Sequence, residues 1–503
     1  MITDNFLLKK PFPGSSTCIL IGRTLEGMEL PAEFCRAVLW VVDAAGSAHP
    51  PTGSVSVLPV DRCAPEQLEK AIDEFLVNSP KSMPSLYVTR QIPLEHESQF
   101  GTAIEIVVAC VESHHRTRVT RQQDAFAWQS SLFENTPAYL TRRLPDSWQG
   151  SFAGIPAFVC GAGPSLDVSA RELAKVAHQG LVLAADSSLS ALSKLGVQAD
   201  FAVSVDIAKT PLKCLPERLA PGRLILSATS PPQWSDAVPN SQLFYVSSNQ
   251  LTLDWFAAQG VSRTKVSVCE NCGATAIELA RFLGCYPICL FGMDMALNSV
   301  GPMRRHHESV DATIYKNSGF NPQQEFPRVP GNFSPEVPTH AIGDWRALDR
   351  RIAEWPEGLV WVVTDRGARL RNTTILRPEE FSLPAVELRK QQRLTALAGP
   401  LSLPEETVYS VLDKLNRFGG YLAEWAPTLR RTLNTGGAKL LVEKLRTLFA
   451  LSENGQMLGA YSLKLMPHLL PPVSEDVAFW GVIIDELENL GRHAMHAAAK
   501  PQS

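Results

Sequence analysis

The chain divides into three stretches that differ in their pattern of apolar and polar positions. Over about residues 16–110, short apolar runs are separated by Pro, Gly and acidic segments, a pattern typical of a small α/β domain. The pattern between Pro65 and Val77 has helical period, and its opening proline suits the first position of a helix. The expected strands are TCILIG, AVLWVVDA, GSVSVLPV, SLYVTR and AIEIVVACV.

The middle stretch alternates short apolar runs with segments of helical period, which is the signature of parallel βαβ units. A polar helix from residue 112 to about 148 and a joint rich in Pro and Gly, PDSWQGSFAGIP, lead into it. The expected strands are Ala157–Cys160, Leu181–Ala185, Phe201–Val205, Leu224–Ser227, Leu243–Val246, Lys265–Cys269, Pro287–Phe291 and Val360–Val363.

Beyond about residue 385 the pattern is helical only. Val408, Val411, Leu412, Leu415 and Phe418 are spaced as one buried face, and further helices are expected at about 437–452, 456–469 and 474–499. The predicted class is therefore α/β, with a Rossmann-like central domain and a mostly parallel sheet. The predicted segments are a small α/β N-terminal domain (1–110), a helical connector (111–150), the central domain (151–384) and an all-helical C-terminal domain (385–503).

Composition narrows the class of protein. The 503 residues are 45% hydrophobic and 19% charged, which excludes a disordered chain and a fibrous repeat. The net charge of −4 provides no overall positive field for nucleic acid or an anionic membrane surface. No apolar run is long enough to span a membrane, and no secretory leader is visible, so a cytoplasmic protein without a membrane span is expected.

The ten cysteines do not indicate a disulfide framework, because most of them lie inside apolar runs where Cys behaves as a small hydrophobe. Cys269, Cys272, Cys285 and Cys289 have a spacing that resembles a zinc site. A helix of about a dozen residues is expected between the two pairs and would separate them by roughly 18 Å. We therefore predict no metal site there and expect residues 271–275 to form a polar turn at a helix start.

Polar residues follow several of the expected central strands. Asp186, Asp206, Asn271 and Asp294 each stand just after an apolar run, where the carboxyl edge of a parallel sheet would gather them around one crevice. Directly after the first of these strands comes Gly161-Ala162-Gly163-Pro164-Ser165-Leu166-Asp167. Its glycines permit close backbone approach, and the helix start that Ser165 caps suits a phosphate. The loop is neither a Walker A motif nor a GxGxxG motif, so a plain strand-to-helix turn stays an alternative.

A second candidate is the segment after Gly292-Met293-Asp294-Met295, which carries Arg304, Arg305, His306, His307 and Tyr315. A histidine supplies a base near neutral pH, and Arg and Tyr supply donors for a departing phosphate. This set of side chains is what transfer from a phosphorylated donor requires. The alternative is a surface loop that contains histidines by chance.

Taken together, these segments resemble the motility-associated factor glycosyltransferases, whose central domain belongs to the 6-hydroxymethylpterin pyrophosphokinase MptE-like family. The resemblance covers about residues 125–385 and is carried by the order and spacing of several motifs. These are GAGPSLD, DSSLSAL with GVQADFAVSVD, NCGATAIELARFLGCYPICLFGMDMA, VPGNFSPEVPTHAIGDWRAL and VVTDRGARLRNTTI.

The resemblance implies a domain similar to sialyltransferases that use CMP-activated sugars, with transfer of a nonulosonic acid to Ser or Thr of flagellin or another surface protein in the cytoplasm. It also implies a donor site around the predicted crevice. Its residues are Gly161, Gly163, Pro164 and Ser165 at the nucleotide phosphate, Asp186, Ser187, Asp206 and Asp294 at the same edge, and Asn271, Gly273 and Thr275 beside the donor.

The family's Gly-Gln-Asp-Leu-Ala block followed by a Lys-Thr-His loop corresponds here to Gly292–Ala296 and Arg305–His307, with Met293 in place of Gln. The implied mechanism is inverting transfer, in which His306 or His307 takes the acceptor proton and Tyr315 helps to hold the leaving phosphate. No cofactor is obligatory, because the CMP leaving group carries a single phosphate that hydrogen bonds can neutralise.

Two other functions remain open at this point. One is ATP-dependent pyrophosphate transfer to a 6-hydroxymethylpterin, which would need Mg²⁺ at Asp206 and Asp294. The other is a non-catalytic scaffold that binds a sugar nucleotide and recruits a partner through its helical C-terminal part. The residues leave open the identity of the sugar and of the acceptor, and also the oligomeric state.

Overall fold

The computed structural model describes residues 6–10, 17–23, 37–43, 55–78, 83–89, 91–215, 221–248, 252–298, 304–307, 326–383, 389–450, 452–469 and 473–500. The chain forms two compact units, residues 1–120 and residues 121–503. Helix α2 (Glu97–Thr141) begins in the first unit and ends in the second.

The first unit is a small α/β domain, as predicted. Its sheet has the strand order β1-β5-β2-β3-β4, and only β1 runs antiparallel to its neighbour. Apolar residues of α1 and of the first part of α2 share one buried cluster with the inner face of this sheet. The bounds are β1 (Phe6–Lys10), β2 (Thr17–Ile21), β3 (Ala37–Val42), β4 (Val55–Pro59), β5 (Ser85–Thr89) and α1 (Pro65–Asn78).

One expected strand of this unit is wrong. The segment AIEIVVACV, residues 103–111, lies inside α2. Its buried residues are Ala103, Val107, Cys110 and Val111, and Phe100, just before the segment, is buried as well. They recur every three or four residues, so they line one helical face even though the segment is rich in β-branched residues. The amphipathic period therefore outweighs the β propensity of the individual side chains.

The second unit contains an eight-stranded sheet in which every neighbouring pair is parallel. The order β10-β9-β8-β7-β6-β11-β14-β15 places two extra strands beside the 3-2-1-4-5-6 arrangement of a dinucleotide-binding fold. The Rossmann-like class is thus confirmed. The bounds are β6 (Ala157–Cys160), β7 (Leu181–Ala185), β8 (Phe201–Ser204), β9 (Arg223–Ser227), β10 (Leu243–Val246), β11 (Ile288–Phe291), β14 (Val360–Val363) and β15 (Thr373–Leu376).

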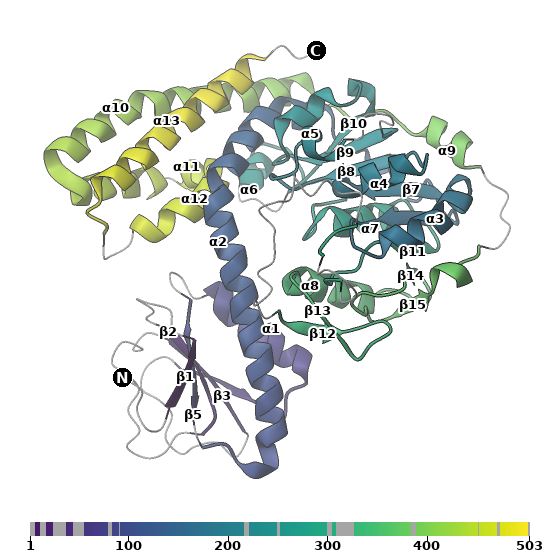
Figure 1. Ribbon diagram of the computed structural model, residues 1–503. Coiled ribbons are helices and arrows are strands. Elements are labelled where there is room, and N and C mark those ends of the chain that lie inside the picture. The colour runs from purple at the N-terminus through teal and green to yellow at the C-terminus, as the bar shows by residue number, and fades with distance from the viewer. Residues whose placement is uncertain are drawn as a thin grey trace. The chain divides into compact units, whose positions relative to one another are not determined.

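Helices cover both faces of this sheet, which explains why its strands are continuous apolar runs. Alternate residues of each strand belong to two separate clusters: Phe158 and Cys160 face one, whereas Ala157 and Val159 face the other. The first cluster also contains residues of α3, α4, α6, α10 and α13, and the second contains residues of α7 and α8. Figure 1 shows α3, α4, α6, α7 and α8 beside the strands.

Two further differences from the prediction concern short elements. Lys265–Cys269 is not a strand, because only Ser267 forms an isolated bridge, to Ser247. The edge strand β15 and the hairpin of β12 (Arg328–Pro330) and β13 (Glu336–Pro338) have no expected counterpart. Their segments are short and rich in Arg, Thr and Pro, so they lack the apolar run that marks the inner strands.

The C-terminal part is helical, as predicted. Helices α10 and α13 lie along each other (Figure 1), and their backbones approach closely because Gly419 and Gly491 face each other. Helix α10 has a break at Gly437, where φ is +71°. The helix bounds in the second unit are α3 (Leu166–Val176), α4 (Leu189–Lys194), α5 (Pro211–Cys214), α6 (Thr252–Ala258), α7 (Cys272–Phe282), α8 (Ile342–Ala353), α9 (Lys390–Ala396), α10 (Glu405–Ala450), α11 (Ser452–Met457), α12 (Gly459–Leu465) and α13 (Val477–Ala499).

None of the helices in the described ranges combines the length and the apolar character that crossing a membrane requires.

Candidate functional site

The carboxyl ends of β6, β7, β8, β11 and β14 lie at one edge of the parallel sheet. The order in which strands are added to the sheet reverses between β6 and β11, since the strands that follow β6 extend to one side and those that follow β11 to the other. Ligands of open α/β folds bind outside the carboxyl ends at such a switch point. Four of the expected site segments start there, namely Gly161–Ser165, Asp186–Ser188, Asp206, and Gly292–Asp294.

The glycine loop after β6 is packed against the loop after β11. A Cβ atom on Gly161 would lie 2.5 Å from Sδ of Met293, and one on Gly163 would lie 2.7 Å from the carbonyl oxygen of Gly292. The backbone N–H of Gly163 donates to that same oxygen at 2.7 Å. Both glycines therefore permit contact between the two loops. Their assignment to a nucleotide phosphate stays a prediction.

Asp294 connects three loops at the switch point. Its Oδ2 accepts the backbone N–H of Ser165 at 2.7 Å, and its carbonyl oxygen accepts the N–H of Ala368 at 2.8 Å. Burial raises the pKa of the Asp294 carboxyl to about 6, although the hydrogen bonds from Ser165 act in the opposite direction. Gly367 (φ +90°) also lies against Asp294, since its Cβ would be 3.0 Å from Oδ1.

Asp186 holds the ends of β7 and β8 and the start of α7 together. Its Oδ2 accepts from Oγ of Ser204 at 2.9 Å and from Sγ of Cys272 at 3.3 Å, while its Oδ1 accepts from the N–H of Ser187 at 2.6 Å. Burial raises the pKa of the Asp186 carboxyl. It also raises the thiol pKa of Cys272 well above its usual range, so this thiol is protonated and donates. Asp206, by contrast, is exposed at the end of β8.

The two histidines differ in their surroundings. His307 is only 2% exposed; its backbone N–H donates to the carbonyl of Ala162 at 2.9 Å, and its Nε2 lies 3.1 Å from the carbonyl of Ser187. Because a carbonyl only accepts, Nε2 carries the proton. His306 is partly exposed. His307 therefore anchors the segment, whereas the ring of His306 is partly exposed even though its Nε2 is buried. Tyr315 lies outside the described residues.

Both histidines are neutral at neutral pH. Burial lowers the pKa of His307. Burial also lowers the pKa of His306, to about 3, and the nearby charges of Arg305, Lys209 and His340 act in the same direction.

Asn271 caps the start of α7 and donates to a partly buried acid. Its Oδ1 accepts the N–H of Ala274 at 2.9 Å, and its Nδ2 donates to Oδ2 of Asp344 at 3.0 Å. Burial raises the pKa of Asp344, and this effect is opposed by Asn271 and Arg305. The hydroxyl of Thr275 is used within the turn, since it accepts from Cys269 N–H and donates to the carbonyl of Asn271. Gly273 contacts Met293 through the same kind of close approach as Gly161.

The functional reading of the sequence missed three charged side chains at this edge: Lys209, His340 and Asp344. Lys209 and His340 lower the pKa of His306. The pKa of Asp344 is lowered by Arg305 and raised by Asp206. A signal existed for all three. Lys209 follows three residues after the strand-end Asp206, and His340 and Asp344 lie in the family-like segment THAIGDWRAL, to which no role was assigned.

The cysteine pairs are arranged as expected around a helix. Cys269 and Cys272 lie at the start of α7, Cys285 follows its end, and Cys289 is buried in β11. Within the described ranges, no group of three or more His, Cys, Asp or Glu side chains could hold a metal ion.

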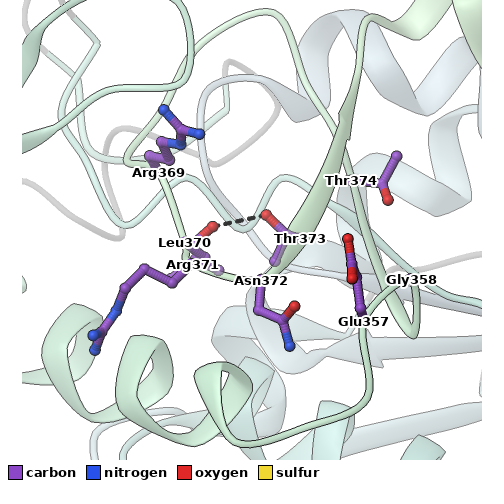
Figure 2. A pocket seen from close by; sticks show the side chains of 8 residues that line it. All are labelled: Glu357, Gly358, Arg369, Leu370, Arg371, Asn372, Thr373 and Thr374. Carbon is purple, nitrogen blue, oxygen red and sulfur yellow. Dashed lines mark hydrogen bonds between the residues drawn. The ribbon is translucent and has the colours of Figure 1, made fainter.

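A separate pocket of about 270 Å³ lies at the opposite edge of the sheet, at the amino ends of β14 and β15 (Figure 2). Thr373 donates its hydroxyl to the carbonyl of Leu370 there at 2.8 Å. None of the predicted site residues lines this pocket. Its lining residues are Glu357, Gly358, Arg369, Leu370, Arg371, Asn372, Thr373 and Thr374.

Comparison with known proteins supports the family resemblance. Residues 130–299 match the family described as 6-hydroxymethylpterin diphosphokinase MptE-like. Among solved structures, the MAf glycosyltransferase from Magnetospirillum magneticum AMB-1 has a similar fold, with a TM-score of 0.53 and 15% sequence identity over 98% of this chain and 80% of that chain. No curated protein matches the sequence. The resemblance to the motility-associated factor family predicted from the sequence is thereby confirmed.

Proposed function

Since residues 130–299 match the MptE-like family and the fold is that of a MAf glycosyltransferase, we propose that this chain is a glycosyltransferase. More specifically, it moves a nonulosonic, sialic-acid-like sugar from a CMP-activated donor to a Ser or Thr hydroxyl of a protein such as flagellin, in the cytoplasm. The observation that carries the proposal is the attachment of the histidine segment to the switch-point edge, where the N–H of His307 donates to the carbonyl of Ala162 and its Nε2 donates to the carbonyl of Ser187.

The donor lies across the carboxyl ends of β6, β7 and β11 in this proposal. The N–H groups of Gly161, Gly163 and Ser165 donate to Phe291, Gly292 and Asp294, so they are already engaged. The glycine loop with Pro164 therefore shapes the floor of the site, and side chains supply most of the charge that faces the phosphate. Asp186 and Asp294 act as buried supports beneath the donor, and Asn271 orients Asp344 at the same edge.

In the transfer step, the acceptor hydroxyl oxygen attacks the anomeric carbon of the sugar. The bond from that carbon to the CMP phosphate oxygen breaks, and its electron pair leaves with CMP. Nδ1 of His306 takes the hydroxyl proton, because its Nε2 is buried, while His307 holds the segment through its bonds to Ala162 and Ser187. Positioning and charge stabilisation dominate, because the transition state resembles an oxocarbenium ion. The proposal requires no metal.

A pterin pyrophosphokinase is the second candidate, since the matched family bears that name. It would use Mg²⁺ at Asp206 and Asp294. The carboxylate of Asp294 already accepts the backbone N–H of Ser165, and its charged neighbours are Asp365 and Arg366. The charged neighbours of Asp206 are Asp186, Asp124 and Asp344. The two carboxylates therefore have different charged neighbours, whereas one Mg²⁺ ion held by both would bring them together. A non-catalytic scaffold is the third candidate, and tight CMP binding without turnover would identify it.

The donor class is tested by nucleotide release. The purified chain is incubated with flagellin and with CMP-, UDP- or GDP-activated sugars in turn, and the released nucleotide is quantified. We expect release from the CMP-nonulosonic donor only. AMP formation from ATP that depends on Mg²⁺ and a hydroxymethylpterin would instead establish the pyrophosphokinase.

A further inference from the structure

Asp186 stands where a dinucleotide-binding sheet places the acid that binds ribose. In that fold, an acid about 20 residues beyond the glycine loop accepts a ribose hydroxyl. Asp186 corresponds to it, because it directly follows β7, the neighbour of β6. Asp186 is only 2% exposed, however, and its two oxygens already accept hydrogen bonds from Ser187, Ser204 and Cys272. A ribose at this edge would therefore need a different acceptor.

Asp344 is an acid with an available oxygen. It lies in the first turn of α8 and is partly exposed. Its Oδ2 accepts Nδ2 of Asn271 at 3.0 Å, whereas its Oδ1 accepts no hydrogen bond from any residue in the described ranges. An ionised carboxylate has room for about four donors. One oxygen thus holds the Asp344 side chain in place, and the other can accept a donor from a ligand.

The start of α7 connects Asp344 to the ends of β7 and β8. Asn271 is followed directly by Cys272, whose Sγ donates to Oδ2 of Asp186 at 3.3 Å and accepts the N–H of Val205 at 3.4 Å. Consecutive Cα atoms are only about 3.8 Å apart. Asp344 therefore lies at the same part of the sheet edge as Asp186.

Hydrogen bonds also join the segment that enters α8 to the loop after β11. Oγ1 of Thr339 donates to the carbonyl of Met295 at 2.6 Å, and the N–H of Leu297 donates to the carbonyl of Pro338 at 2.9 Å. Strand β11 is the neighbour of β6 across the switch point. Asp344 is therefore held from both sides at the place where open α/β sheets bind nucleotides.

The charges near Asp344 suit an uncharged ligand group. Burial raises the pKa of its carboxyl, and the bond from Asn271 opposes this effect. Glu270 and Asp206 raise the pKa further, whereas Arg305 lowers it. Two of its three charged neighbours are thus acids, which disfavour a phosphate or carboxylate beside it. A hydroxyl group can donate to the free oxygen without adding negative charge.

We propose that Asp344 is a specificity-determining residue whose free oxygen accepts a hydrogen bond from a ribose hydroxyl of the nucleotide, and that Asn271 positions it. This role rests on the proposed function only in requiring a ribonucleotide, which CMP-sugars and ATP both contain. Hydroxyl groups of the transferred sugar have the same chemistry, so the test includes the free sugar as a separate probe.

Calorimetric titration with a pair of nucleotides tests this role. CMP is compared with 2′,3′-dideoxy-CMP, which keeps the base and the phosphate but lacks both ribose hydroxyls. We expect wild type to bind CMP about tenfold more tightly, a difference typical of one hydrogen bond to a charged group, and Asp344→Ala to bind both equally. The matched control is Asp413→Ala, at a partly exposed acid on α10, and should keep the tenfold ratio. Free N-acetylneuraminic acid should bind wild type and Asp344→Ala equally.

A wild-type ratio near one, or a ratio that Asp344→Ala leaves unchanged, would overturn this role even if the chain transfers sugar. A loss of affinity for N-acetylneuraminic acid with an unchanged nucleotide ratio would place the transferred sugar at Asp344, and would overturn it too. A ratio that depends on Asp344 in a chain without transferase activity would support the role and refute the proposed function.

Two further measurements keep the test decisive. If Asp344→Ala does not fold, Asp344→Asn keeps the size of the side chain but removes its charge, and its preference for CMP should be smaller than that of wild type. An unchanged preference would contradict the role of the carboxylate. If CMP does not bind, ATP and 2′,3′-dideoxy-ATP form the pair and the same ratio is expected, and a chain that binds neither nucleotide would contradict both proposals.

Discussion

Oδ2 of Asp294 accepts the backbone N–H of Ser165 at 2.7 Å, and this bond joins the loop after β11 to the helix start after β6. The two strands are parallel neighbours at the point where the strand order reverses. One buried carboxylate thus sets the spacing between the two loops that form the floor of the proposed donor site.

Replacing Asp294 should separate these loops. Asp294→Ala leaves the buried N–H of Ser165 without its acceptor, so we expect the free energy of unfolding to fall by about 1–3 kcal/mol. Asp294→Asn retains an acceptor oxygen and should cost less. Chemical denaturation at pH 4, well below the raised pKa of about 6 of the Asp294 carboxyl, measures both variants. Equal stability of wild type and Asp294→Ala would show that the bond does not hold the loops.

The same carboxylate should make stability depend on pH. The pKa of Asp294 is about 6 in the folded chain against 3.8 for an ordinary Asp, so between these values the folded state retains a proton that the unfolded chain has released. The contribution of Asp294 to stability therefore falls as pH rises from about 4 to about 6, by up to roughly 3 kcal/mol. The difference between wild type and Asp294→Asn should narrow or reverse over that window. A difference independent of pH would contradict the raised pKa.

Adding one methyl group to the glycine loop should disrupt the floor of the site. In Gly163→Ala the new Cβ would lie 2.5 Å from Oδ2 of Asp294 and 2.7 Å from the carbonyl of Gly292. The latter is a backbone atom that cannot rotate away, so we expect a loss of about 1–3 kcal/mol. The matched control is Gly481→Ala on α13, where a Cβ meets no atom within 4 Å. This control should be neutral or slightly stabilising, and similar unfolding curves for the two variants would refute the packing argument.

Substitutions of His306 and His307 should have different kinetic effects. His306→Gln removes the proposed base, so kcat for CMP release should fall by about 10²–10⁴ with little change in donor affinity. His307→Gln removes the bond to Ser187 and should weaken donor binding as well as kcat. His178→Ala, at an exposed histidine after α3, is the control. Wild-type kcat in His306→Gln would refute its assignment as the base.

Much of the fold was predictable because its inner strands are buried on both faces. Such strands form continuous apolar runs, and seven of the eight central strands expected from these runs are present. Residues 103–111 were misassigned because their β-branched side chains obscure a helical period. Edge elements such as β15 lack an apolar run and were missed.

The site was only partly predictable for a different reason. Residues that directly follow strands, such as Asp186 and Asp294, are signalled by their place in the pattern. Lys209 and His340 come from segments separated by more than a hundred residues, and only the folded chain brings their charges to His306. The roles of the glycines also needed the structure, because a sequence does not show whether a close approach involves a ligand or another loop.

The central claim is tested most directly by the intact mass of flagellin after incubation with the chain and a CMP-nonulosonic donor. Our account predicts a mass increase of one or more nonulosonic acid residues, equal in amount to the CMP released and absent with His306→Gln. An unchanged flagellin mass, while the donor is hydrolysed or stays intact, would contradict it.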